Sequence, residues 1–231
     1  MPQTIALIGA MPPEISLLQE NLQNLRSEHM ADFDIYCGEY AGKNVVLALS
    51  GIGKVNAALS TALVLQHRPD FVINTGSAGG LGSGLKVGDV VIGTQTAHHD
   101  VDVTAFGYAI GHVPRMPARF ESDPALCAAA EKAAAAFEHT AVHRGLIVSG
   151  DQFVHSSESV AEVRRHFPDA QAVEMEAAAI AQSCHRFGVP FVVVRAISDL
   201  ADEEADTSFE TFLKTASVHS AKMVLQLIEA L

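Results

Sequence analysis

Short apolar runs that end at glycine, serine or aspartate recur along the chain, and they restrict its fold more than any other feature. Three of them, residues 4–10, 71–84 and 189–199, read as strands buried on both faces. Segments with apolar residues at helical spacing separate these runs. Strands that alternate with helices predict an α/β fold, with a mixed, mostly parallel central sheet flanked by helices.

The remaining segments fit the same alternation. We expect further strands over 33–40, 44–50, 87–99 and 144–154, the last running into a loop. We expect helices over 12–25, 51–70, 123–139, 156–167, 173–188 and 208–231. Apolar positions of the second helix are Val55, Ala58, Leu59, Ala62, Leu63 and Leu65. Asp123 is an N-cap candidate and Gly188 a C-terminal stop, whereas 100–122 lacks periodicity and predicts a long loop. No linker, repeat or low-complexity boundary interrupts the 231 residues, so we predict one domain, 1–231.

The composition disfavours several classes of protein. The chain has 27 acidic and 15 basic residues, a formal net charge of -12 and no basic cluster, which disfavours nucleic-acid binding. Its apolar runs fall far short of the roughly 20 residues that a membrane helix needs. Cys37, Cys127 and Cys184 are far apart without CxxC spacing, which indicates buried thiols in a reducing compartment. We therefore expect a soluble, cytoplasmic protein.

Glycines and carboxylates gather where the predicted strands end. In an open α/β sheet, ligands bind at the carboxyl ends of the strands, and glycine allows a close approach of the backbone. The strand ends are residues 9–11, 50–53, 75–80, 149–151 and 198–199. The carboxylates near this edge are Glu14, Asp151, Glu174, Glu176 and Asp199. The sequence therefore predicts a ligand site with several carboxylates.

Common nucleotide and metal motifs do not fit this edge. No G-x-G-x-x-G follows a strand, and after Gly53-Lys54 a valine replaces the Ser or Thr of a P-loop. The run HHDVD at 98–102 has metal-binding residue types, but no matching ligand set occurs elsewhere. We interpret it as a polar strand end and loop.

Seven motifs follow one another along nearly the whole chain: GAMPPE, SGIGKVNAA, NTGSAGG, HHDVDVTAFGY, RGLIVSGDQF, VEMEAAAIA and RAISDLAD. Together they resemble the motif series of the 5′-methylthioadenosine/S-adenosylhomocysteine nucleosidase family, in the purine nucleoside phosphorylase superfamily. The resemblance implies a nucleoside phosphorylase-like fold and hydrolysis of the N-glycosidic bond of these two nucleosides, with 5′-deoxyadenosine as a further candidate. The implied products are adenine and a 5-thioribose sugar. No cofactor or metal is implied.

Two carboxylates carry the implied chemistry. Asp199, in AISD, matches the general acid that protonates the five-membered ring of adenine, and enclosure at a strand end raises the pKa of such a carboxyl. Glu14, in GAMPPE, matches the carboxylate that activates water. Pro12 and Pro13 depart from the family pattern, in which acidic residues are common at these positions. The logic is that of glycoside hydrolysis in general.

The resemblance also assigns the residues that bind substrate. Glu176 matches the ligand of the ribose hydroxyls, Met175 packs on the sugar, and Glu174 is a secondary contact. Phe153 matches the aromatic that stacks on adenine, and the backbone of Val154 binds the edge of the base. Ser77, Arg195 and Ser198 match further positions near the sugar and the acid. The apolar lining for the alkylthio arm is Ile52, Val103, Phe106 and Phe209, with a core role as the alternative for Ile52 and Val103.

Homodimers are typical of the family, and the loop around 103–117 resembles the segment that one subunit lends to the pocket of its neighbour. That role accounts for a long loop that retains Phe106, Tyr108 and Pro114.

Other functions account for parts of the sequence. A phosphorylase needs an anion site, and Glu14 after the first strand repels an anion, so hydrolysis is favoured. An aminodeoxyfutalosine nucleosidase of menaquinone synthesis shares the motifs and stays open. A non-catalytic nucleoside sensor has no need of both Glu14 and Asp199, and an interaction protein does not explain the glycine-rich strand ends.

Overall fold

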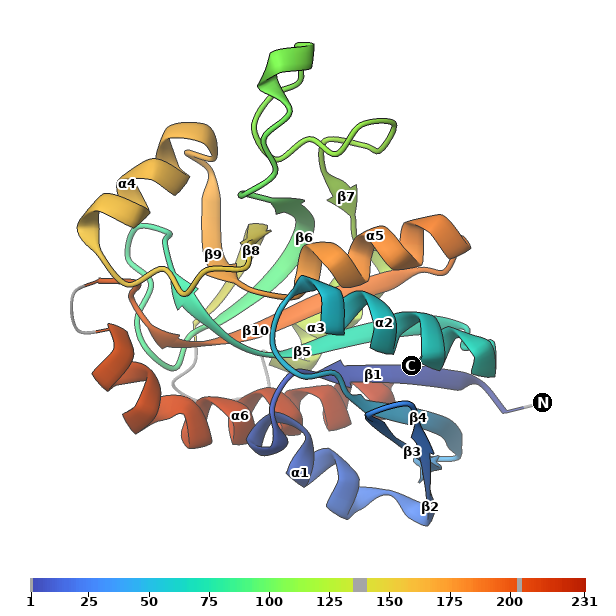
Figure 1. Cartoon of the computed structure of the whole chain (residues 1–231). Helices are drawn as coiled ribbons and strands as arrows, with labels where there is room; N and C mark the ends of the chain where they lie inside the picture. Colours follow the sequence, from blue (N-terminus) through green and yellow to red (C-terminus); the bar gives the residue numbers. More distant parts are fainter. Residues whose placement is uncertain (1, 135–140, 203–204) are drawn as a thin grey trace.

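The structure is a computed structural model that describes residues 2–134, 141–202 and 205–231 (Figure 1). Its strands are β1 (Thr4–Gly9), β2 (Gln23–Met30), β3 (Phe33–Tyr40), β4 (Lys43–Leu49), β5 (Phe71–Gly80), β6 (Val90–His98), β7 (Phe120–Glu121), β8 (Val142–Ser149), β9 (Ala170–Glu174) and β10 (Phe191–Asp199). Its helices are α1 (Pro12–Asn21), α2 (Lys54–Val64), α3 (Pro124–Ala134), α4 (Ser157–His166), α5 (Ala177–Phe187) and α6 (Ala205–Ala230), with short 3-10 helices η1 (Leu65–His67) and η2 (Thr104–Phe106).

Strand β5 organises the sheet. It pairs in parallel with β1 over Phe71–Asn74 and with β10 on its other side, and it meets β9 at Gly79 and Gly80. The pairings of β5 with β10, β10 with β6, β6 with β8, β8 with β9 and β9 with β5 form a closed ring. The sheet therefore curls, and the carboxyl ends of β5, β8, β9 and β10 come together. The predicted α/β fold with a mixed, mostly parallel sheet and flanking helices is confirmed.

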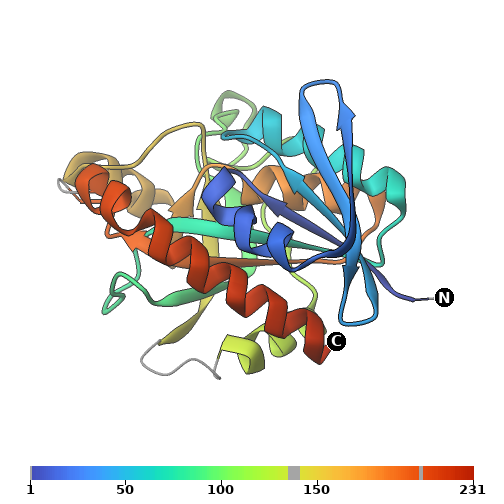
Figure 2. The ribbon, with the colours of Figure 1, turned by 90° about the horizontal axis from the view of Figure 1, so that it is seen from below.

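Helices cover both faces of the sheet, as the continuous apolar runs require. Ile5 and Leu7 of β1 point to one side and pack with α1, α3 and α6, whereas Ala6 and Ile8 point to the other and pack with α2 and α5. Figure 2 shows α1 and α6 on the same side of the sheet. No helix within the described residues is long and apolar enough to cross a membrane.

The helix predicted over 12–25 is too long. It starts at the prolines as expected but ends at Asn21, and the following residues form β2, which pairs with β3. Seven of the eight β2 residues are exposed, so this edge strand has no burial alternation that a sequence pattern would show.

The helix predicted over 173–188 starts too early. Residues 170–174 form β9, and α5 begins at Ala177 because Ala172 and Val173 are paired to the strands beside them. Its predicted end is confirmed, since Gly188 adopts the left-handed conformation, with φ of 70°.

Other boundaries shift less. Asp123 caps α3 by accepting the N–H of Ala125 and Leu126, as predicted, and residues 135–139 of that predicted helix lie outside the described residues. The last helix begins at Ala205, before the predicted residue 208.

The predicted apolar face of α2 is wrong in part. Val55 and Leu59 are 69% and 52% exposed, whereas Ala57, Thr61 and Val64 pack inward. The prediction that all three thiols are buried is also wrong. Cys127 and Cys184 are buried, but Cys37 is half-buried because it lies on β3, near the edge of the sheet.

Candidate active site

A cavity of about 240 Å³ opens where the carboxyl ends of β1, β5, β9 and β10 converge. Most of the site residues predicted from the sequence line it: Glu14, Ile52, Ser77, Phe153, Val154, Glu174, Met175, Glu176, Ser198, Asp199 and Phe209. The wall also contains Ala10, Met11, Ala78, Gly79, Gln152 and Val173. A cavity with four carboxylates therefore lies at the edge of the sheet where the glycine-rich strand ends predict a ligand site.

Three predicted site residues lie elsewhere. Arg195 is 1% exposed and stands behind the cavity wall on β10. Val103 and Phe106 belong to the loop after β6, and Phe106 is 82% exposed. Neither Val103 nor Phe106 lines the cavity within this single chain.

Glu14 is held on two sides by hydrogen bonds. Its Oε2 accepts the N–H of Ala10 at 2.8 Å and of Met11 at 3.1 Å. Its Oε1 accepts the N–H and the hydroxyl of Ser77, at 2.9 and 3.1 Å. Because α1 begins at Pro12, the side chain turns back onto the loop that precedes its own helix and bridges it to β5. Only 2% of the residue is exposed, so its orientation is fixed.

Glycine at position 76 is required by a close approach. A Cβ atom at Gly76 would lie 2.3 Å from Nη1 of Arg195 and 2.6 Å from Oε1 of Glu14. The guanidinium therefore reaches past the bare backbone of β5 towards the Glu14 carboxylate. A side chain at this position would separate the two groups.

Glu174 anchors the start of α5. Its Oε2 accepts the backbone N–H of Glu176 at 3.0 Å and of Ala177 at 2.9 Å, together with Nη2 of Arg195. The hydroxyl of Ser149 donates to Oε1 of Glu174, and its oxygen accepts the backbone N–H of the second residue of α5. With both oxygens engaged, Glu174 holds the turn that carries Met175 and Glu176.

Glu176 faces the cavity from that turn. Its Oε1 accepts the N–H of Gly53 at 2.9 Å, and its Oε2 lies 3.8 Å from Nη2 of Arg195. Burial, and then the neighbouring carboxylate of Glu174, raise the pKa of Glu176, while Arg195 opposes the rise. A carboxylate in this state gains from any new partner that donates hydrogen bonds.

Asp199 ends β10 and is 2% exposed. Its Oδ1 accepts the N–H of Ala201 and its Oδ2 the hydroxyl of Ser198, both at 2.9 Å. Burial raises the pKa of Asp199, and these two donors oppose the rise. A Cβ atom at Gly79 would lie 2.9 Å from Oδ1, so this glycine leaves room for the carboxyl.

The aromatic side of the cavity comes from two distant segments. Phe153, after β8, meets Phe209 of α6 edge to face, with ring centroids 5.6 Å apart. Phe153 is 43% exposed and Ile52 52% exposed, so both form the rim. An apolar rim beside two buried carboxylates suits a flat heterocyclic base joined to a polar sugar.

Comparison with known proteins agrees with this geometry. Residues 4–229 match the family model of the phosphorylase superfamily. A 5′-methylthioadenosine/S-adenosylhomocysteine nucleosidase of Anoxybacillus flavithermus is 54% identical over 228 residues, 98% of each chain. The crystal structure of such a nucleosidase from Neisseria meningitidis, in complex with methylthio-immucillin-A, matches with a TM-score of 0.97 and 64% identity over 99% of this chain and 100% of that one. The Colwellia psychrerythraea nucleosidase, in complex with adenine, also has a TM-score of 0.97, with 44% identity over 100% of this chain and 96% of that one.

The chain belongs to the 5′-methylthioadenosine/S-adenosylhomocysteine nucleosidase family. It is therefore an N-glycosyl hydrolase, as its motif series predicts.

Three charged residues of this nucleosidase, Lys54, Asp100 and Asp151, link two loops beside the cavity, and the sequence does not predict this link, which we call the brace. Nζ of Lys54 lies 2.5 Å from Oδ1 of Asp100, and Oδ2 of Asp100 accepts the N–H of Asp151 at 2.9 Å. Asp151 in turn accepts the N–H of Lys54 at 2.8 Å. The brace joins the loop of Ile52 to the loop of Phe153. The three residues are 46 to 97 positions apart in pairs, so no local motif signals it.

Proposed function

We propose that this nucleosidase hydrolyses the N-glycosidic bond of 5′-methylthioadenosine and S-adenosylhomocysteine, with Asp199 as general acid and Glu14 as the base for water. One observation carries the proposal: two buried carboxylates, held by different donors, line the same cavity. The ligands of the related structures, methylthio-immucillin-A and adenine, support the substrate class.

Asp199 has the environment that an acid needs. Burial raises its pKa, which favours a carboxyl that still carries its proton when the substrate arrives. That proton goes to the five-membered ring of adenine as the bond to the sugar breaks. The base then leaves neutral, and a positive charge develops on the sugar.

Glu14 stands where water can be activated. Its four hydrogen bonds fill its acceptor sites, and the hydroxyl of Ser77 is the one donor that can rotate away. Rotation of this hydroxyl frees Oε1 to take a proton from water, whose oxygen bonds to the sugar carbon. Glu14 is hydrogen-bonded to Ser77, and Asp199 lies beside Gly79, two residues further along β5. The two carboxylates therefore contact different positions of the same strand.

Glu176 and the aromatic rim complete the site. In the proposal, Glu176 accepts the ribose hydroxyls, and this contact strengthens as positive charge develops on the sugar. Met175 packs on the sugar, Phe153 stacks on the base, and the backbone of Val154 binds the base edge. Ile52 and Phe209 accept the alkylthio arm. Glu174 acts as a positioning residue, since its oxygens are already bound to the protein.

Incubation with 5′-methylthioadenosine, with and without phosphate, tests the reaction. We expect adenine release at the same rate in both, with a free 5-thioribose sugar as the second product. Strict dependence on phosphate and a sugar 1-phosphate product would show a phosphorylase instead. Release of adenine only from aminodeoxyfutalosine would identify the alternative nucleosidase.

We also propose that the enzyme is a homodimer in which the loop of 103–117 completes the pocket of the partner. An apolar surface supports this: Ile52, Val55, Leu59, Phe106 and Phe187 are each more than half exposed. Val55 and Phe187 line a groove of about 400 Å³ between α2 and α5. The loop with η2 projects beyond these helices (Figure 1), so its phenylalanine is free to reach a second copy.

We propose in addition that the chain forms a single domain and that the protein is cytoplasmic. Three free thiols support the cytoplasmic location.

A further inference from the structure

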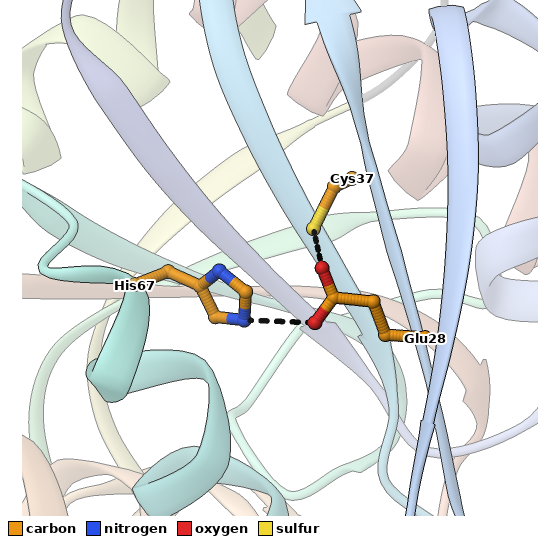
Figure 3. Close-up of side chains that lie close together, drawn as sticks. All are labelled: Glu28, Cys37 and His67. Carbon is orange, nitrogen blue, oxygen red and sulfur yellow. Dashed lines mark hydrogen bonds and ion pairs between the residues drawn. The ribbon is translucent and has the colours of Figure 1, made fainter.

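Glu28, Cys37 and His67 form a compact cluster outside the active site (Figure 3). They come from three segments: β2, β3 and η1. His67 follows α2, whose other end touches the active site through Gly53. The 14 residues from Lys54 to His67 correspond to roughly 20 Å of helix, so the cluster is remote from the cavity.

The register of the β2–β3 hairpin creates the cluster. Cys37 is opposite Arg26, which makes Glu28 its diagonal neighbour on the same face of the sheet. Ile35, opposite Glu28, packs with residues of α2, so this face is turned towards α2 and η1. His67 thereby reaches the carboxylate from the helix side.

The distances are close to those of a metal site. Cys37 Sγ lies 3.7 Å from Oε1 of Glu28, and Nε2 of His67 lies 3.7 Å from Oε2 of Glu28. The three ligand atoms all lie within 4.8 Å of one another. Ligands of a tetrahedral zinc ion are roughly 3.3–3.8 Å apart, given bonds of about 2.0–2.3 Å. Small side-chain shifts are therefore enough to place all three atoms around one ion.

The residue types select a class of ion. Thiolate and imidazole bind zinc and similar transition metals, whereas calcium and magnesium prefer oxygen ligands alone. Among the ion pairs of the described residues, Glu28 has no lysine or arginine partner and meets only His67. Its charge is thus available to a cation.

We propose that Glu28, Cys37 and His67 bind a divalent transition metal of the zinc type, with water in the fourth position. On binding, the Cys37 thiol loses its proton to solvent and a metal–sulfur bond forms. The ion ties the exposed edge hairpin to the end of α2, so it stabilises the fold and takes no part in hydrolysis.

Titration of the full chain, without a histidine tag, with Co²⁺ tests the site. We expect one equivalent to produce the near-ultraviolet charge-transfer band of a cobalt–thiolate bond, and Zn²⁺ to remove it. Cys37→Ser must abolish the band, and His67→Gln must weaken binding by about tenfold or more. His29→Gln is the matched control, because His29 lies beside Glu28 on the same strand but pairs with Asp34. No band in the parent, or an unchanged band in Cys37→Ser, would overturn the proposal.

A second readout uses the thiol itself. Cys127 and Cys184 are 1% and 0% exposed, so a thiol reagent added to the folded protein should modify Cys37 alone. We expect Zn²⁺ to protect this thiol in the parent, whereas in His67→Gln it remains reactive and loses protection. Equal reactivity with and without Zn²⁺ in the parent would contradict the site. Cys37→Ser should hydrolyse substrate at the parental rate, so the outcome is independent of the proposed function.

Discussion

The backbone N–H of Gly53 donates a hydrogen bond to Oε1 of Glu176 over 2.9 Å, and this bond joins two loops that are 123 residues apart in sequence. The next residue, Lys54, pairs with Asp100 and holds the same loop from outside. The Glu176 carboxylate, which faces the cavity, is thus held by a glycine whose next residue is fixed by an ion pair. Substitutions at this ion pair should therefore affect substrate binding although neither residue lines the cavity.

Lys54→Met tests this dependence. The side chains of Lys54 and Asp100 are 18% and 14% exposed, so the variant leaves a poorly solvated carboxylate unpaired. We expect a loss of about 1–3 kcal/mol in the free energy of unfolding. We also expect kcat/KM to fall about tenfold, through loosening of the loops of Ile52 and Phe153. Asp100→Asn in the same chain should restore part of the stability, and strictly additive effects in this double-mutant cycle would contradict the brace.

Glu174→Gln should damage both fold and activity. The new amide cannot replace a carboxylate that accepts two backbone N–H groups and Arg195, and it leaves the buried guanidinium without the closer of its two ion-pair partners. Breaking a buried pair in this way costs about 3–5 kcal/mol. Denaturant unfolding, beside steady-state kinetics, measures both effects. Ser149→Ala should have a smaller effect, because it removes only one neutral donor, and the reverse order would count against the anchoring role.

The difference in stability between Asp199→Asn and the parent should depend on pH in a defined direction. The folded pKa of Asp199 lies above its unfolded pKa, so ionisation is disfavoured in the folded state. This penalty is complete above the folded pKa and disappears as the pH falls below the unfolded pKa of about 3.9. We expect Asp199→Asn to melt above the parent at neutral pH, with the difference shrinking towards pH 4. Melting curves of parent and variant between pH 4 and neutral pH test this prediction. A variant that is less stable than the parent at neutral pH would show that the carboxylate is stabilised by its surroundings.

Leu59→Glu tests the proposed dimer. A charge on the exposed face of α2 should convert a dimer into a monomer in light scattering, and it should raise KM because the pocket loses the loop of the partner. Leu25→Glu, at an exposed leucine of β2, is the matched control and should remain dimeric. A parent that is monomeric and fully active at assay concentration would rule out the shared pocket.

Much of this architecture follows from local sequence patterns. The continuous apolar runs predict β1, β5 and β10, and the polar residues at their ends predict the carboxylates that meet in one cavity. Such patterns work because burial on both faces of a strand leaves an uninterrupted apolar signature.

Other features depend on contacts that no local pattern encodes. Strand β2 is exposed along nearly its whole length, so only its ladder to β3 defines it. Strand β9 runs into an alanine-rich helix, so the local pattern predicts helix from residue 173, whereas pairing to β5 and β8 makes residues 173 and 174 part of a strand. The cluster of Cys37 with Glu28 and His67 spans three elements, whereas metal motifs recognisable in sequence have short, regular spacings.

Single-turnover release of adenine from 5′-methylthioadenosine by Asp199→Asn tests the central claim most directly. With enzyme in excess, loss of the general acid should slow release by about 10²–10⁴-fold while the variant stays folded and still binds substrate. Glu14→Gln should show a comparable loss, because the amide cannot take a proton from water. Asp32→Asn, at an exposed carboxylate between β2 and β3, is the control and should release adenine at the parental rate. If folded Asp199→Asn releases adenine within a few-fold of the parent, the acid assignment is wrong and another group must protonate the leaving base.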